Sequence, residues 1–215
     1  MSKLILASAS PRRKELLEQI GAVFEIIPAK GEEVITKVAP EEVVMELAMQ
    51  KAQEVAEHSV NLEEGMMTAT GKDKKEDNTR DCIVIGADTV VAYEGVILGK
   101  PKDREDAIRM LSMLSGKTHS VYTGVAIICR TKEQEQLLNF YEETKVAMYP
   151  MSEEEIRRYV DSGDPMDKAG SYGIQGSCAI HICRIEGDYN NVVGLPVARI
   201  YQEMSRLGIE ICRNS

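Results

Sequence analysis

Leu-Ile-Leu-Ala-Ser-Ala-Ser-Pro-Arg-Arg, at residues 4–13, is the segment from which the fold of the N-terminus can be predicted. Its apolar start is typical of a buried strand, and the small residues that follow fit a tight turn. Ser10 is a good N-cap and Pro11 is a good first helical residue. The segment therefore predicts a strand, a turn and a helix over residues 13–20, which Gly21 closes.

The same turn favours the binding of a phosphate. A helix N-terminus offers free backbone N–H groups and the positive end of the helix dipole. The guanidinium groups of Arg12 and Arg13 add fixed positive charge, and Ser8 lies in the turn itself. A well-capped surface helix with two solvated arginines is the alternative interpretation.

The composition of the 215-residue chain fits one globular domain over residues 1–215, with 43% apolar residues. The net charge of −9 argues against nucleic acid as a partner, because a nucleic-acid backbone requires a basic face. The chain contains no apolar run long enough for a membrane span and no secretory signal, so we expect a cytoplasmic protein without a membrane partner.

Apolar and amphipathic runs alternate along the chain, which predicts an α/β fold. The expected strands cover residues 3–7, 24–28, 82–93 with a break, 120–130, 139–148 and 178–186. The expected helices cover residues 13–20, 41–57, 104–114, 153–162 and 196–207. Asp103 and Ser152 are expected N-caps, and Gly116 and Gly163 are expected just past helix ends.

Residues 61–81 differ from the rest of the chain. They contain few large aliphatic residues and many Lys, Asp, Glu, Thr and Gly residues. This composition predicts a flexible surface insertion between a helix and a central strand.

Asp88 is the main candidate for catalysis, because it lies within the apolar run of residues 82–91. A carboxylate in a buried strand costs several kcal/mol unless it is paired or binds a metal ion. Glu32 and Glu33 follow the second expected strand and could join Asp88 on a hard divalent cation. A turn aspartate at residue 88 and a solvated pair of loop glutamates are the alternatives.

Three lysines are further candidates for phosphate binding. Lys51 lies in the expected helix over residues 41–57, and Lys100 precedes Pro101. Lys168 opens a segment with three glycines, residues 168–176, and these glycines allow a ligand to approach the backbone closely. If the fold gathers the lysines with the two arginines, they supply enough positive charge for a triphosphate.

Six motifs together resemble one family. They are S-A-S-P-R-R at 8–13, G-A-D-T-V-V at 86–91, G-K-P at 99–101, S-G-K-T-H-S-V-Y-T-G-V at 115–125, D-K-A-G-S-Y-G-I-Q-G at 167–176 and N-V-V-G-L-P at 191–196. In this order they resemble the Maf-like nucleoside triphosphate pyrophosphatases, from about residue 3 to residue 208. Residues 61–81 are not covered, and Glu32-Glu33 stands where the family usually has Asp-Glu.

The resemblance implies a fold like that of inosine triphosphate pyrophosphatase: an elongated, twisted mixed sheet flanked by helices, with a cleft between two lobes. It implies hydrolysis of a nucleoside triphosphate to the monophosphate and pyrophosphate with Mg²⁺ or Mn²⁺, and it suggests a homodimer. Some members of the family are linked to arrest of septum formation in dividing bacteria. A nucleotide-binding regulator with little turnover is therefore the alternative function.

The resemblance also implies roles for particular residues. Asp88 matches the proton acceptor, and Glu33 and Asp88 are the expected metal ligands. The expected phosphate-binding residues are Ser8, Arg13, Lys51, Lys100 and Lys168. The residues expected to choose the base are Arg12, Thr89 and Gln175.

The last three residues favour one subgroup of the family. The subgroup associated with dTTP and UTP carries Arg, Thr and Gln at these positions, as this chain does. The subgroup associated with 7-methyl-GTP carries Trp, Gln and Glu. The amide of Gln175 offers a donor and an acceptor to the imide edge of a pyrimidine. Modified pyrimidine nucleotides and 7-methyl-GTP are the alternative substrates.

Overall fold

The structure is a computed structural model that describes residues 3–66, 81–131 and 134–212. Its strands are β1 (Lys3–Leu6), β2 (Glu25–Ile26), β3 (Cys82–Tyr93), β4 (Val96–Leu98), β5 (Thr118–Arg130), β6 (Glu135–Met148) and β7 (Ile182–Glu186). Its α-helices are α1 (Pro11–Gln19), α2 (Pro40–Met66), α3 (Arg104–Leu114), α4 (Glu153–Asp161), α5 (Tyr189–Val193) and α6 (Val197–Arg206). Three 3-10 helices, η1 (Asp164–Asp167), η2 (Ala169–Ser171) and η3 (Ser177–His181), lie between α4 and β7.

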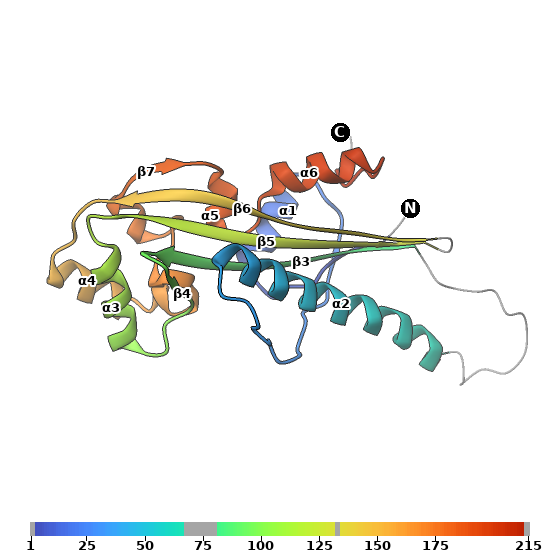
Figure 1. Cartoon of the computed structure of the whole chain (residues 1–215), viewed down its shortest axis with the longest axis horizontal. Coiled ribbons are helices and arrows are strands. Elements are labelled where there is room, and N and C mark those ends of the chain that lie inside the picture. Colours follow the sequence, from blue (N-terminus) through green and yellow to red (C-terminus); the bar gives the residue numbers. More distant parts are fainter. Residues whose placement is uncertain (1–2, 67–80, 132–133, 213–215) are drawn as a thin grey trace, which may run out of the picture.

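The strands form one mixed sheet in the order β2-β1-β3-β5-β6-β7, with β4 paired to β3. The strand β1 runs parallel to β2 and β3, whereas the pairs from β3 to β7 are antiparallel. The long strands β3, β5 and β6 run along the length of the molecule (Figure 1). The mixed α/β architecture with an elongated sheet and flanking helices is therefore confirmed.

Helices cover both faces of the sheet (Figure 1). Alternation along β1 directs Leu4 and Leu6 into the core beneath α1 and α6, and it directs Ile5 and Ala7 into the core beneath α2. A third cluster lies at the other end of the molecule, where α3 and α4 pack against the ends of β3 and β5. A cavity lies where β1 ends, and residues of both the β1–α1 turn and α2 line it.

Most helix ends agree with the sequence signals. Asp103 accepts a hydrogen bond from the N–H of Asp106, and Ser152 forms a capping box with Glu155. Gly116 and Gly163 both follow helix ends with positive φ angles, as Gly21 and Gly208 do. The expected helix over residues 104–114 is confirmed at both ends. The first helix begins at Pro11 rather than at residue 13, because Ser10 caps it.

Three predictions about elements were wrong in part. Residues 61–66 of the expected insertion continue α2, because Leu and Glu extend a helix that has already nucleated at little cost. The remainder of the insertion, residues 67–80, lies outside the described residues. The strand expected over residues 178–186 begins only at Ile182, after η3. The expected break in residues 82–93 is absent, since β3 is continuous there, and the turn aspartate at residue 88 is excluded.

Within the described residues, no helix combines the length and the apolar character that a membrane crossing requires.

Candidate active site

A cavity of about 880 Å³ opens beside the β1–α1 turn. Its wall includes segments far apart in the sequence: the β1–α1 turn, α2, the middle of β3 and the glycine-rich segment after η1. We call this cavity the cleft. All ten of the predicted site residues line it: Ser8, Arg12, Arg13, Glu33, Lys51, Asp88, Thr89, Lys100, Lys168 and Gln175.

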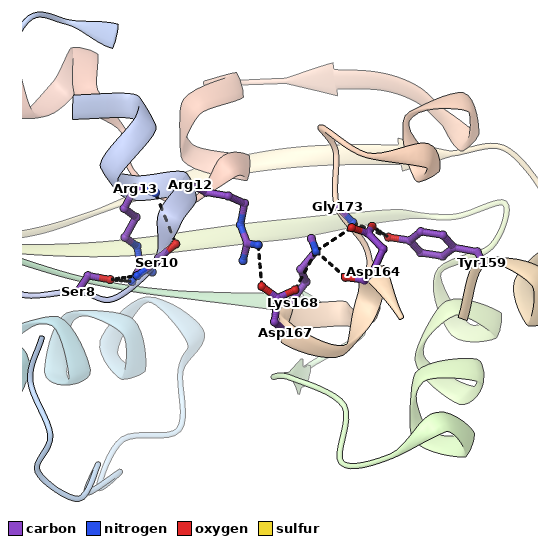
Figure 2. Close-up of polar contacts among 9 residues, drawn as sticks. All are labelled: Ser8, Ser10, Arg12, Arg13, Tyr159, Asp164, Asp167, Lys168 and Gly173. Carbon is purple, nitrogen blue, oxygen red and sulfur yellow. Dashed lines mark hydrogen bonds and ion pairs between the residues drawn. The ribbon is translucent and has the colours of Figure 1, made fainter. Parts of the chain in front are cut away.

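Arg13 lies in the first turn of α1, and three neutral oxygen atoms orient its side chain. Its Nε donates to the carbonyl of Gly194 at 2.8 Å. One terminal nitrogen donates to Ser8 Oγ at 3.0 Å and the other to Thr89 Oγ1 at 3.0 Å. Figure 2 shows the contact with Ser8 at the N-terminus of α1. Burial lowers the pKa of Arg13, and the nearby Asp88 opposes this shift. A guanidinium remains charged at neutral pH even so.

Thr89, which is predicted to help choose the base, also takes part in the hydrogen bonds around Arg13. Its hydroxyl contacts Arg13 and also lies 3.0 Å from the hydroxyl of Thr123. Thr123 in turn donates to the carbonyl of Asn191. This chain of hydrogen bonds fixes the plane of the Arg13 guanidinium relative to β3.

Two carboxylates meet at the ammonium group of Lys51. Lys51 Nζ lies 2.5 Å from Asp88 Oδ1 and 2.9 Å from Glu33 Oε1. The side chains of Lys51 and Asp88 are only 17% and 15% exposed, whereas that of Glu33 is 52% exposed. Asp88 lies in the middle of β3, opposite Gly124 of β5. The lysine is the partner that a carboxylate needs at this half-buried position.

The residues present fit a hard divalent cation. Glu33 and Asp88 converge on one cation, the Lys51 ammonium, and their oxygens are the ligand type that Mg²⁺ and Mn²⁺ prefer. With Lys51, the two carboxylates carry a net charge of −1. The described residues contain no cluster of three or more Asp, Glu, His or Cys side chains suited to a metal. Mg²⁺ commonly takes one or two carboxylates together with substrate phosphates.

Arg12 points away from Arg13 and towards the glycine-rich segment (Figure 2). Its guanidinium pairs with Asp167 Oδ2 at 2.9 Å, and Asp167 Oδ1 accepts from Lys168 Nζ at 2.8 Å. Burial raises the pKa of Asp167, but the hydrogen bonds from Lys168 and Arg12 outweigh it and bring that pKa to about 2. The ion pair joins α1 to η1 at the cleft.

Lys168 is held by protein oxygens. Its ammonium also contacts the carbonyl of Asp164 at 2.5 Å and the carboxylate of Asp164 at 3.1 Å. Asp164 accepts from the Tyr159 hydroxyl, which accepts from the N–H of Gly173 (Figure 2). In this conformation the Lys168 ammonium is surrounded by protein oxygens, and its role in phosphate binding stays a prediction.

The glycines of this segment have a steric explanation. A Cβ atom at Gly173 would lie 2.7 Å from Lys168 Cε, and one at Gly176 would lie 3.0 Å from Asp164 Oδ2. The backbone that carries Gln175 thus wraps directly over the Asp164–Lys168 pair. Gln175 itself is exposed at the cleft, and Lys100 is exposed after β4.

Sequence reasoning missed several residues around the cleft. Tyr159, Asp164 and Asp167 form the network beneath the glycine-rich segment, and Ile35 and Lys37 line the cleft. The spacing of Asp164 and Lys168, four residues apart, was a usable signal for an ion pair. Tyr159 had no such signal, because its contact depends on how α4 packs against η1.

The fold and the cleft together define a nucleotide-processing class of α/β protein, and comparisons with known proteins identify the family. The chain matches the Maf-like protein family over residues 3–207, and it belongs to that family. It is 63% identical over 216 residues to the dTTP/UTP pyrophosphatase of Agathobacter rectalis, with 98% of this chain and 100% of the relative covered. It is 49% identical over 212 residues to the dTTP/UTP pyrophosphatase of Bacillus anthracis, with 98% of each chain covered.

Proposed function

We propose that this protein hydrolyses dTTP and UTP to the nucleoside monophosphate and pyrophosphate with the help of Mg²⁺ or Mn²⁺. Relatives named dTTP/UTP pyrophosphatase, similar over 98% of the chain, support the proposal. The observation that carries the proposal is the arrangement of charged side chains in the cleft. A guanidinium bound by neutral oxygens lies near a pair of carboxylates that share one cation.

Arg13 is suited to the phosphates because its charge is not neutralised by direct contact. Among the described residues, its contacts occupy three of the five N–H groups of the guanidinium. One N–H on each terminal nitrogen is left for phosphate oxygens, and such charge-assisted bonds are strong. Ser8 accepts a hydrogen bond from one terminal nitrogen of Arg13, and the exposed Lys100 adds a second cation at the cleft. These residues would bind the triphosphate and stabilise pyrophosphate as it leaves.

Glu33 and Asp88 would hold the metal ion, which when bound offsets negative charge on the phosphates. Lys51 lies between the two carboxylates and orients both through its ion pairs with them. Asp88 is the proposed general base: it accepts a proton from the water that attacks the α-phosphorus, and the bond to the leaving pyrophosphate breaks. The Asp88 carboxylate has two oxygens with about four lone-pair sites, so contacts with Lys51, the metal ion and the water can be accommodated together.

The choice of base is assigned to Arg12, Thr89 and Gln175. We propose that Gln175 reads the imide edge of thymine or uracil with its amide group. Arg12 is held across the cleft by Asp167, so it defines the distance between α1 and the segment that carries Gln175. Thr89 acts through its hydrogen bond to Arg13. Lys168 positions the same segment through its contacts with Asp164 and Asp167.

The experiment that tests this function is a nucleotide panel with Mg²⁺ and with Mn²⁺. The purified protein is incubated with dTTP, UTP, the other common triphosphates and 7-methyl-GTP, and pyrophosphate and monophosphate are measured separately. We expect pyrophosphate with TMP or UMP as the main products. Release of phosphate with a diphosphate would contradict the proposed bond cleavage, and no turnover on any nucleotide would favour the regulator.

The variant Gln175→Glu tests the choice of base in the same assay. It replaces the amide donor with a carboxylate, which cannot donate to the imide edge. We expect kcat/KM for dTTP and UTP to fall while that for 7-methyl-GTP rises. An unchanged substrate profile would remove Gln175 from the base-reading set.

The homodimer also belongs to this proposal. It is checked by the mass of the protein in solution, measured by light scattering after size exclusion. A monomer across the concentration range of the assay would contradict it.

A further inference from the structure

The segment over residues 30–36, which we call the strap, connects β2 to α2 and carries Glu33. It contains no helix or strand, and most of it is exposed. Its backbone groups cannot be satisfied by a regular ladder, so they need other partners or water. These partners are three side chains of α2.

The three side chains are Glu46, Gln50 and Glu54, which are spaced four residues apart and so share one face of the helix. Glu54 accepts from the N–H of Lys30 at 2.7 Å and from the N–H of Gly31 at 3.0 Å. Gln50 accepts from the N–H of Val34 at 3.0 Å and donates to the Val34 carbonyl at 2.6 Å.

The third set of hydrogen bonds between α2 and the strap lies at the C-terminal end of the strap. Glu46 accepts from the N–H of Thr36 at 2.9 Å and from its hydroxyl at 2.5 Å. The strap thus runs antiparallel to α2 with an anchor at each successive turn. The backbone N–H groups of Lys30 and Gly31 lower the pKa of Glu54, which is the expected effect of a carboxylate that accepts both bonds.

Glu33 lies between two residues whose N–H groups donate to α2 side chains, Gly31 and Val34. Its carboxylate is 52% exposed, so it gains little orientation from packing. Lys51, the partner of Glu33, follows Gln50 directly on the same helix. The anchors and the cation that Glu33 meets therefore belong to one rigid element.

We propose that Glu46, Gln50 and Glu54 are positioning residues that hold Glu33 against Lys51 and Asp88, so that the two carboxylates form one divalent-cation site. This inference rests on the metal site that the proposed function assigns to Glu33 and Asp88, and it depends on the proposed hydrolysis only for its effect on turnover. The position of the strap and the binding of the cation are properties that can be measured without any reaction.

The first test uses Glu54→Gln, with Glu57→Gln as the matched control on the exposed face of the same helix. Glutamine keeps the size of the side chain but puts an NH₂ group opposite one of the two backbone N–H donors. Amide hydrogen exchange of residues 28–38 is measured in both variants and in the wild type. We expect faster exchange of the strap in Glu54→Gln alone, with α2 and the sheet unchanged.

The second test measures the affinity for Mn²⁺ without nucleotide, by calorimetric titration. The loss of a group that orients a metal ligand typically weakens the metal by about 10–100-fold. We expect a loss near the lower end of that range, about 10-fold, in Glu54→Gln, and none in Glu57→Gln. In a Glu33→Gln background, Glu54→Gln should cause no further loss, because its effect passes through Glu33.

The outcomes are distinct. The inference is overturned if the exchange of the strap is unchanged in Glu54→Gln, or if it is faster while the Mn²⁺ affinity stays the same. It is also overturned if the wild type does not bind Mn²⁺, or if Glu54→Gln causes its full loss of affinity again in the Glu33→Gln background. If the strap and the Mn²⁺ affinity respond as expected but no nucleotide yields pyrophosphate, the inference stands and the proposed function fails. If turnover is measurable, the Mn²⁺ concentration for half-maximal activity should rise in parallel with the loss of affinity.

Discussion

Asp88 illustrates how one carboxylate can be kept in the middle of a central strand. Residues 82–87 and 90–91 of β3 are buried and carry no polar side chain other than the thiol of Cys82, so an unpaired charge among them would be strongly unfavourable. Lys51 offsets that penalty through a contact at 2.5 Å, and the side chain of Asp88 stays partly solvated at the cleft. The same contact orients the carboxylate for chemistry.

Replacement of this carboxylate tests the proposed general base. In Asp88→Asn the amide oxygen still accepts from Lys51, so the fold should persist, but the side chain no longer takes up a proton. A positioned general base contributes roughly 10²–10⁴-fold. We expect kcat for pyrophosphate release to fall by at least the lower figure, with an unchanged circular dichroism spectrum. Asp81→Asn, an exposed residue just before the same strand, serves as the control. Near-normal turnover of Asp88→Asn would remove the residue from catalysis.

The cations of the cleft differ in how much of their charge is available. Arg13 contacts only neutral oxygens, whereas Arg12 pairs with Asp167 and Lys168 pairs with two carboxylates. From the sequence all three were equal candidates for phosphate binding, because each is a cation next to a turn or a glycine. This difference in charge neutralisation follows from the partners that the fold supplies.

The packing of α2 on the sheet depends on two glycines. A Cβ atom at Gly124 in β5 would lie 2.2 Å from the carbonyl oxygen of Val44, and one at Gly86 in β3 would lie 2.3 Å from that of Ala48. The backbone of α2 therefore touches the backbone of the sheet. This close approach is what allows Lys51, on the same helix, to reach Asp88.

Gly124→Ala should accordingly destabilise the protein. The new methyl group meets backbone rather than a flexible side chain, so α2 must move away from the sheet. Overpacking of a core typically costs about 1–3 kcal/mol, and we expect about 3 kcal/mol here in urea unfolding. Gly99→Ala is the control, because the space around its Cβ position is open, and it should change stability by less than about 0.5 kcal/mol. Equal stabilities for the two variants would contradict this account of the packing.

Helix boundaries were the most predictable features of the elements. Ser10, Asp103 and Ser152 cap helices because their side chains accept from backbone N–H groups a few residues ahead, which is a local interaction. The end of α2 was mispredicted because the helix continues into residues 61–66, and the start of β7 was mispredicted because alternation does not show that η3 precedes the strand.

His119 connects the sheet to the glycine-rich segment. It is a buried residue of β5, and its Nε2 lies 2.8 Å from the hydroxyl of Tyr172. Burial lowers the pKa of His119 from 6.5 to about 4. The folded protein therefore keeps this imidazole neutral at a pH at which the unfolded chain would protonate it.

This difference predicts a loss of stability in mild acid. Because the unfolded state binds the extra proton first, the free energy of unfolding falls as the pH drops from 6.5 towards about 4, by up to about 1.4 kcal/mol per unit. Between pH 7 and pH 5 we expect a loss of about 2 kcal/mol, before most carboxylates titrate. His119→Gln should flatten the curve, and His58→Gln, an exposed control, should not. The same slope in all three proteins would show that other groups cause it.

The whole molecule joins an acidic surface to a partly cationic cleft. The chain carries a net charge of −9, yet the cleft contains six Lys and Arg side chains: Arg12, Arg13, Lys37, Lys51, Lys100 and Lys168. A local cluster of this kind suits a small phosphorylated ligand better than a nucleic-acid backbone. The single domain over residues 1–215 remains a prediction.

The turn at residues 8–13, the capped helices, the mixed α/β class and the set of candidate residues could all be predicted from the residues themselves or from their ordered motifs. These features rest on local hydrogen bonds, backbone preferences and motif order, which a linear chain displays directly. The partners of the individual cations, the Lys51 bridge between Glu33 and Asp88, and the anchoring of the strap could not be predicted. Each depends on a contact between segments far apart in the chain, and such contacts exist only after α2 and the glycine-rich segment have packed beside the sheet.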